Sequence, residues 1–270
     1  MKRVLRKKMK LISTLIIGFI IFMGSLNSDV LKVRAYPLLR EIQHELILYK
    51  TKHYQQLETE HFIIRYEPEE EAIIDLVAQA AERDYKAVCD MFGYYPKEKT
   101  MIIVYHNSEN LMKNTNLGQG KPPMGVYFAS TIQILSPRLW ISEDENMQDI
   151  FMNEGPMIHE FTHLVVDDVT KGNYPLWFTE GVALYQEYVQ TGYEWGKNAS
   201  FEGVPYTVEQ LAQNFHQLDE ILAYKRSFEI VKEIVEDQGF EKINHTLELL
   251  GEGKEFDRVH SEVLGTSLQK

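Results

Sequence analysis

The stretch MIHEFTHL at residues 157–164 contains two histidines four residues apart, His159 and His163, with Glu160 directly after the first. On an α-helix, residues four apart project from the same face, so both imidazoles can reach one cation. Neutral imidazole nitrogen is a good zinc ligand. Glu160 lies about 100° round the helix from His159, where it can sit beside a metal without ligating it and accept a proton from water.

A third ligand has to come from elsewhere in the chain, because a catalytic zinc site usually has three protein ligands. Residues 175–185 read PLWFTEGVALY, and Glu180 is the one charged residue in this apolar run, which predicts a second helix. A buried carboxylate is costly unless it is paired or metal-bound, so Glu180 is the candidate ligand. The small residues Gly181 and Ala183 are expected to let the two metal helices approach closely.

Other potential ligands are few. Asp167 and Asp168 are rivals to Glu180, but Asp167 follows His163 by four residues and is interpreted as a supporting or structural carboxylate on the same helix face. The single cysteine, Cys89, excludes an internal disulfide framework and a cysteine-based zinc site, and it is expected to be a small buried residue.

The periodicity of the surrounding chain predicts an α+β fold with strands in the first half and helices in the second. In the first half we expect a strand at 61–66, an amphipathic helix at 69–92 ended by Gly93, a strand at 100–105, a helix turn and loop at 107–123, and one strand or a short hairpin at 125–135. In the second half we expect a loop at 198–205 and helices at 208–222 and 224–238.

The N-terminus has the pattern of a secretory signal: six bases within the first ten residues, followed by the uncharged apolar run Leu11–Met23. Extended to Leu26, this run is still shorter than the roughly 20 residues of a full membrane span. Residues 33–35 form only a weak cleavage site. A cleaved signal and an uncleaved anchor both fit, and both place the body outside the cytoplasm, because the basic end stays inside.

The chain has 270 residues and a formal net charge of −12, and the residues after the first ten carry −18. This length allows one large domain or two lobes that share a site, and the 44% hydrophobic content can bury a core. An acidic body argues against a nucleic-acid partner, because that affinity comes mostly from Lys and Arg on phosphates.

The two motifs together, His159-Glu160-x-x-His163 and Trp177-x-x-Glu180-Gly181-x-Ala183-x-Tyr185, resemble the gluzincin metallopeptidases, specifically small bacterial proteins with a peptidase MA-like domain. The resemblance runs from about His61 to Leu268. It implies a zincin-like fold with a mixed β-sheet and active-site helix in the N-terminal lobe and a helical C-terminal lobe. It implies zinc (Zn2+) held by His159, His163 and Glu180, Glu160 as general base, and 125–135 as an edge strand along which a peptide lies.

The chain departs from the family at one position. Thermolysin and related gluzincins orient the first histidine with an Asp four residues past the glutamate ligand, where this chain has Leu184, so Glu187 is the candidate partner. The resemblance also implies a Tyr or His that holds the oxyanion. Tyr224 is the first candidate, because it is expected to open a helix over the cleft; the alternatives are Tyr185, Tyr188 and His216.

These features predict an exported zinc metalloendopeptidase, secreted or anchored in the membrane by its N-terminal segment, that hydrolyses peptides or proteins with zinc-activated water. The expected organisation is a leader at 1–35, a helical connector at 36–57 and a peptidase domain at 58–268, with lobes at about 58–170 and 171–268. An alternative is a non-catalytic extracytoplasmic module that binds a peptide or cell-wall component on a zincin scaffold, although an intact Glu160 argues against it. A hydrolase of non-peptide amides is a third reading.

Overall fold

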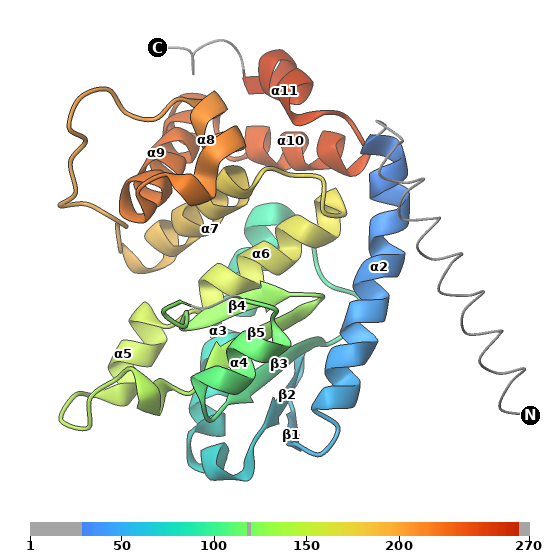
Figure 1. Cartoon of the computed structure of the whole chain (residues 1–270), viewed down its shortest axis with the longest axis vertical. Coiled ribbons are helices and arrows are strands. Elements are labelled where there is room, and N and C mark those ends of the chain that lie inside the picture. The colour runs from blue at the N-terminus through green and yellow to red at the C-terminus, as the bar shows by residue number, and fades with distance from the viewer. Residues whose placement is uncertain (1–28, 118–119, 265–270) are drawn as a thin grey trace, which may run out of the picture.

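Five strands form one mixed sheet in the order β1-β2-β3-β5-β4 in the computed structural model, which describes residues 29–117 and 120–264 (Figure 1). Strands β2, β3 and β5 are parallel, and β1 and β4 pair antiparallel at the two edges. The bounds are β1 Gln55–Glu58, β2 Phe62–Tyr66, β3 Thr100–Tyr105, β4 Gly125–Phe128 and β5 Thr131–Leu135. The predicted strands at 61–66 and 100–105 are therefore confirmed.

The predicted segment 125–135 is a hairpin and not a single strand. Its two-residue turn, Ala129 and Ser130, has φ of 50° and 58°, as expected for a turn that follows the right-handed twist of the paired strands. Tyr127 of β4 lies opposite Ile132 of β5. The hairpin makes β4 an edge strand of the sheet.

Each face of the sheet has its own helical cover, because successive residues of a strand point to opposite faces. Phe62 and Ile102 belong to the main core, together with apolar residues of α3 (Ile74–Phe92) and α6 (Met157–Thr170). Ile103 on the opposite face packs in a second cluster with Leu111 of α4 (Ser108–Asn114) and Ile47 of α2 (Asp29–Lys50). The metal-motif helix α6 therefore rests on the sheet.

The helix predicted at 69–92 begins as a 3-10 turn at Pro68–Ile73 and continues as α3. It ends as predicted at Gly93, whose φ of 62° is left-handed and whose N–H donates to the carbonyls of Asp90 and Cys89. Glycine suits this position because it has no Cβ to clash there. Cys89 is completely buried in the core, as expected.

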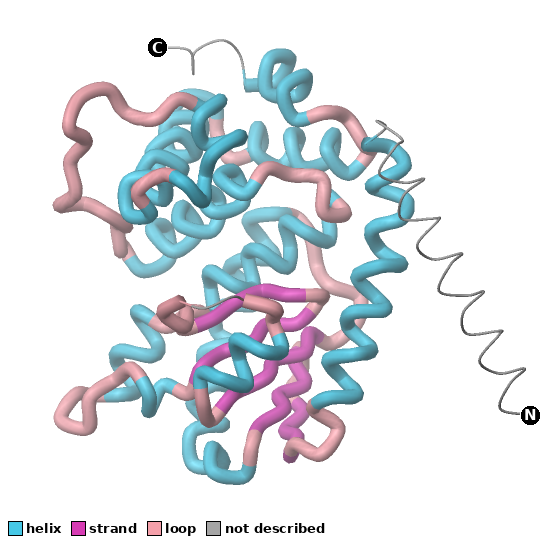
Figure 2. Tube along the Cα trace, in the orientation of Figure 1, coloured by secondary structure: helices cyan, strands magenta, loops and turns pink. Residues whose placement is uncertain are grey.

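Among the described residues, strands occupy the first half of the chain and helices follow β5. In space the strands, drawn in magenta, gather in one sheet with cyan helices around it (Figure 2). The helices after β5 are a 3-10 turn at Pro137–Leu139, α5 Met147–Glu154, α6, α7 Leu176–Thr191, α8 Val208–Asn214, a 3-10 turn at Phe215–Gln217, α9 Glu220–Gln238, α10 Glu241–Gly251, α11 Phe256–Val259 and a π-helical turn at His260–Leu264. This layout agrees with the predicted α+β class and is consistent with a zincin-like fold.

Two details of the helical part differ from the prediction. The helix expected at 208–222 breaks before Asp219, because the Asp219 side chain caps α9 by accepting a hydrogen bond from the N–H of Leu222. Tyr224 thus lies in the second turn of α9 and does not open it. Gly181 allows α7 to pack closely on α9 and not, as expected, on α6, because a Cβ there would lie 2.4 Å from the carbonyl oxygen of Ser227.

Helix α2 extends beyond the connector predicted at 36–57. It begins at Asp29, inside the segment assigned to the leader, and ends at Lys50, while residues 55–57 belong to β1. Its inner face is held on the body, with Val33 5% and Ile47 2% exposed. Within 29–117 and 120–264, no helix combines the length and apolarity that crossing a bilayer requires. The apolar run Leu11–Leu26 lies outside the described residues.

Candidate metal centre

Three potential ligand atoms converge between helices α6 and α7. The Nε2 atoms of His159 and His163 lie 3.2 Å and 3.4 Å from the same oxygen, Oε2 of Glu180. The ligand atoms of the three residues all lie within 4.8 Å of one another. The four-residue spacing places both imidazoles on one face of α6, and the antiparallel approach of α7 brings the carboxylate to them. The sequence-predicted trio is thus brought together in one place.

The other nitrogen of each imidazole has a partner of its own. Nδ1 of His163 lies 2.7 Å from Oγ1 of Thr179, and Nδ1 of His159 lies 3.5 Å from Oε2 of Glu187. Histidines that ligate metals usually donate their second N–H to such a group, which fixes the ring and its tautomer. Glu187 therefore contacts His159 in the way expected of the family's Asp, which this chain replaces with Leu184.

The carboxylates around the histidines make the site strongly attractive to a cation. Burial alone would lower the pKa of His159, but the charges of Glu187, Glu180 and Glu160 raise it well above its ordinary value. Burial alone would raise the pKa of Glu180, but the imidazoles of His163 and His159 hold it well below the usual range. This field favours positive charge at the point where the three ligand atoms meet.

Glu160 lies beside this point and belongs to the buried side of α6, where it is 6% exposed. Burial raises the pKa of its carboxyl group, while the two imidazoles and a hydrogen bond from the backbone N–H of Tyr127 oppose the rise. Gly125 of β4 packs against it, since a Cβ at Gly125 would lie 2.9 Å from Cγ of Glu160. The edge strand thus forms one wall of the site.

Tyr224 reaches the site from the second turn of α9. Burial raises the pKa of its phenol, and the charges of Glu180, Glu220 and Glu160 raise it further. These influences place its hydroxyl near the carboxylates of Glu180 and Glu160. Tyr224 is therefore a neutral hydrogen-bond donor next to the ligand cluster, as a candidate oxyanion-binding residue has to be.

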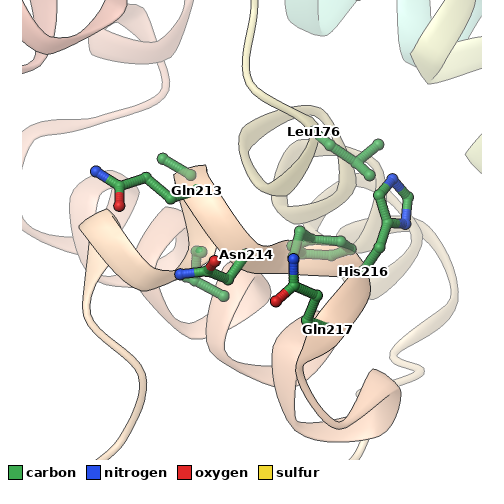
Figure 3. Close-up of a pocket in the computed structure, with 8 residues that line it drawn as sticks. Leu176, Gln213, Asn214, His216 and Gln217 are labelled. Atoms are coloured by element: carbon green, nitrogen blue, oxygen red, sulfur yellow. The ribbon is translucent and has the colours of Figure 1, made fainter.

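The three alternatives to Tyr224 make other contacts. The ring of Tyr185 stacks on Phe240, and the ring of Tyr188 meets Phe228 edge to face. His216 is exposed and lines a separate cavity of about 240 Å³, beside Leu176 at the start of α7 (Figure 3). These contacts give none of the three a link to the ligand cluster.

The rival ligands Asp167 and Asp168 do not belong to the converging group and have other partners. Asp167 is completely buried and accepts hydrogen bonds from Arg40 and from three tyrosines, while Asp168 accepts hydrogen bonds from Arg40 and Tyr94. Asp167 is therefore a structural carboxylate, in line with its interpretation from the sequence.

The donor set fits zinc. Two imidazole nitrogens and one carboxylate oxygen form the usual protein ligands of a catalytic zinc ion, and both imidazoles already have the second partners that such ligands need. His159, His163 and Glu180 would hold the ion.

Sequence reasoning missed three neighbours of the site, namely Thr179, Gly125 and the backbone of Tyr127. Thr179 could have been found, because it directly precedes Glu180 on a helix that faces His163. The positions of Gly125 and Tyr127 depend on how β4 lies against α6, which no local pattern encodes.

Comparison with known proteins agrees with this geometry. The family model described as Peptidase MA superfamily matches residues 88–269, two thirds of the chain, and this range contains all three candidate ligands and Glu160. No curated protein shows significant similarity to the sequence. The length and position of the family match establish that the chain belongs to the Peptidase MA superfamily.

Proposed function

We propose that the protein is an exported zinc-dependent metallopeptidase of the gluzincin type that hydrolyses peptide bonds. One observation carries the proposal: the imidazoles of His159 and His163 and the carboxylate of Glu180 converge within 4.8 Å, with Glu160 beside them. Membership of the Peptidase MA superfamily supports peptidase activity. The gluzincin assignment rests on the glutamate that α7 contributes as the third ligand.

In this proposal Glu160 is the general base. When bound, zinc supplies Lewis-acid polarisation of the scissile carbonyl and lowers the pKa of water. Glu160 accepts the proton of the attacking water and then delivers it to the leaving amine. Burial raises the pKa of Glu160, which makes this carboxylate a better proton acceptor than one in water.

Two further parts of the chain have proposed roles in the same reaction. The Tyr224 hydroxyl is placed to donate a hydrogen bond to the oxyanion of the tetrahedral intermediate, next to Glu180. Edge strand β4 can pair with an extended peptide, because an edge offers backbone donors and acceptors to an added strand. The substrate is therefore proposed to be a peptide or a protein segment in extended form.

Export is also part of the proposal and rests on the sequence alone. The basic first ten residues and the apolar run Leu11–Met23 are typical of a signal or anchor that places the following chain outside the cytoplasm. The protein is proposed to be secreted or held at the membrane by this segment.

The test is metal analysis of the purified full-length chain, followed by cleavage of a peptide library. We expect about one zinc per chain and cleavage that falls at least about a hundredfold after chelation and returns with added zinc. A chain that binds zinc but cleaves no library peptide would instead favour the non-catalytic binding module.

Gly125→Ala is expected to lower kcat/KM by up to about a hundredfold without loss of zinc. The added Cβ would lie 2.7 Å from Cβ of Pro156 and 2.9 Å from Cγ of Glu160, so either Glu160 or β4 has to move. Gly120→Ala is the control, because its Cβ would meet nothing within 4 Å. Steady-state kinetics on a cleaved library peptide makes the comparison. Equal kcat/KM in the two variants would show that β4 does not position Glu160.

A further inference from the structure

The inner face of α2 is joined to the last turn of α6, the helix that carries both histidine ligands. Nη1 of Arg40 donates to Oδ2 of Asp167 at 2.7 Å and to Oδ1 of Asp168 at 2.6 Å. The side chain of Asp167 is completely inaccessible to solvent, and that of Arg40 is only 20% exposed. Because a buried carboxylate is costly without a counter-charge, Arg40 stabilises Asp167 in this place.

Asp167 is also the centre of a tyrosine cluster that joins several elements. Its Oδ1 accepts hydrogen bonds from Tyr36 of α2 at 2.6 Å and from Tyr174 of the α6–α7 connection at 3.1 Å. Its Oδ2, which Arg40 contacts, also accepts a hydrogen bond from Tyr127 of β4 at 2.7 Å. The carboxylate therefore ties the edge strand and the active-site helix to α2.

Tyr127 carries the connection onward to the site. Its hydroxyl donates to Asp167, and its strand packs against Glu160, since a Cβ at Gly125 would lie 3.1 Å from Oε1 of Glu160. Helix α2 meets the same hairpin a second time, where Nδ1 of His44 lies 3.1 Å from the carbonyl oxygen of Ala129 in the β4–β5 turn. Helix α2 thus supports the edge strand at its middle and at its turn.

Helix α2 also fits closely against the α6–α7 connection. A Cβ at Gly172 would lie 2.6 Å from the ring of Tyr36, so the glycine is needed for this approach. The contact places Tyr36 against the chain that leads from His163 to Glu180. Arg40 therefore lies within a docked region of α2 and not at a frayed end.

We propose that Arg40 is a positioning residue for the peptidase site. It fixes the Asp167 carboxylate, Asp167 fixes the side chain of Tyr127, and β4 then presents its backbone to Glu160 in the productive place. The kinetic consequence of this role of Arg40 rests on the proposed function, whereas the effect of Arg40 on the position of β4 does not. Helix α2 is accordingly part of the catalytic unit, although the family match begins at residue 88.

The experiment compares Arg40→Gln with Arg65→Gln in the full-length chain. Arg65 of β2 also secures α2, through the carbonyl oxygen of Leu48 at 2.9 Å and, just past the helix, Oγ1 of Thr51 at 3.1 Å, but it does so at the C-terminal end of α2. Hydrogen exchange of peptides that cover residues 124–135 is expected to quicken at least about tenfold in Arg40→Gln and to stay at the parental rate in Arg65→Gln.

Kinetics provides a second measurement. Arg40→Gln should lower kcat at least about tenfold with zinc content unchanged, and Arg40→Lys should recover most of this loss because it restores the counter-charge. Tyr127→Phe removes only the hydroxyl link and should give the same kcat defect, which keeps the test open if Arg40→Gln fails to fold.

The outcomes separate the two proposals. If the Arg40 and Arg65 variants change exchange and kcat alike, or if Tyr127→Phe behaves as the parent, Arg40 contributes only general stability and its positioning role is overturned. If the parent hydrolyses no peptide, the proposed function fails, and the exchange comparison alone still decides whether Arg40 positions β4.

Discussion

Glu160→Gln is expected to keep its zinc and to lower kcat by about 10²- to 10⁴-fold. Glutamine has nearly the same shape and can keep the contact with β4, but it cannot accept the proton of the attacking water. Since Glu160 is not among the three convergent ligands, the metal should stay. The variant therefore separates proton transfer from metal binding.

The measurement is the rate of library-peptide cleavage together with the zinc content. Glu71→Gln is the control, because Glu71 is an exposed glutamate distant from Glu160 in the sequence. A Glu160→Gln variant that cleaves as fast as the parent would rule out this residue as the base.

Glu180→Ala is expected to weaken zinc binding by more than about a hundredfold, a loss larger than that from removing a group that only orients a ligand. The change removes the oxygen that lies 3.2 Å and 3.4 Å from the two imidazole Nε2 atoms. It also removes a negative charge that makes the space beside His159 and His163 favourable for a cation. Hydrolysis should be lost with the metal.

Zinc titration with a competing chelator measures this effect. Glu187→Gln is the graded comparison: it touches His159 only through Nδ1, so it should weaken binding by about ten- to a hundredfold. Full zinc occupancy in Glu180→Ala would remove Glu180 from the ligand set and with it the gluzincin assignment.

The histidine pair and the main elements were predictable because their signals are local. A four-residue spacing places His159 and His163 on one helix face whatever surrounds them, and Gly93 ends α3 through its own backbone freedom. The strand at 100–105 is a continuous apolar run, typical of a strand buried on both faces, and the structure buries it along its whole length. Such features need no knowledge of the tertiary fold.

Other features depend on which segments meet, and they were mispredicted or missed. Gly181 was expected to bring α7 close to α6, but the position where its Cβ would lie faces Ser227 of α9. The helix predicted at 208–222 was carried past Leu218, because the spacing of apolar residues gives no information about helix caps. Asp219 is a favoured N-cap residue and could have indicated the break.

The bond between Arg40 and Asp167 joins residues 127 positions apart, and no spacing rule could have paired them. The sequence indicated only that Asp167, four residues after His163, is a supporting or structural carboxylate. It could not indicate that the partner of Asp167 comes from a helix that begins within the predicted leader.

The order of strands in the sheet bears on self-association. The family match begins at residue 88, yet β2 lies before it and pairs in parallel with β3 from Phe62 to Tyr66. A chain shortened to the matched range would leave β3 as an open, uncharged and mostly apolar edge, the kind of strand that templates pairing with other chains. In the full sequence β1 and β2 cover that edge, and the short outer strand β1 ends the sheet in glutamine and glutamate, residues that disfavour pairing with another chain.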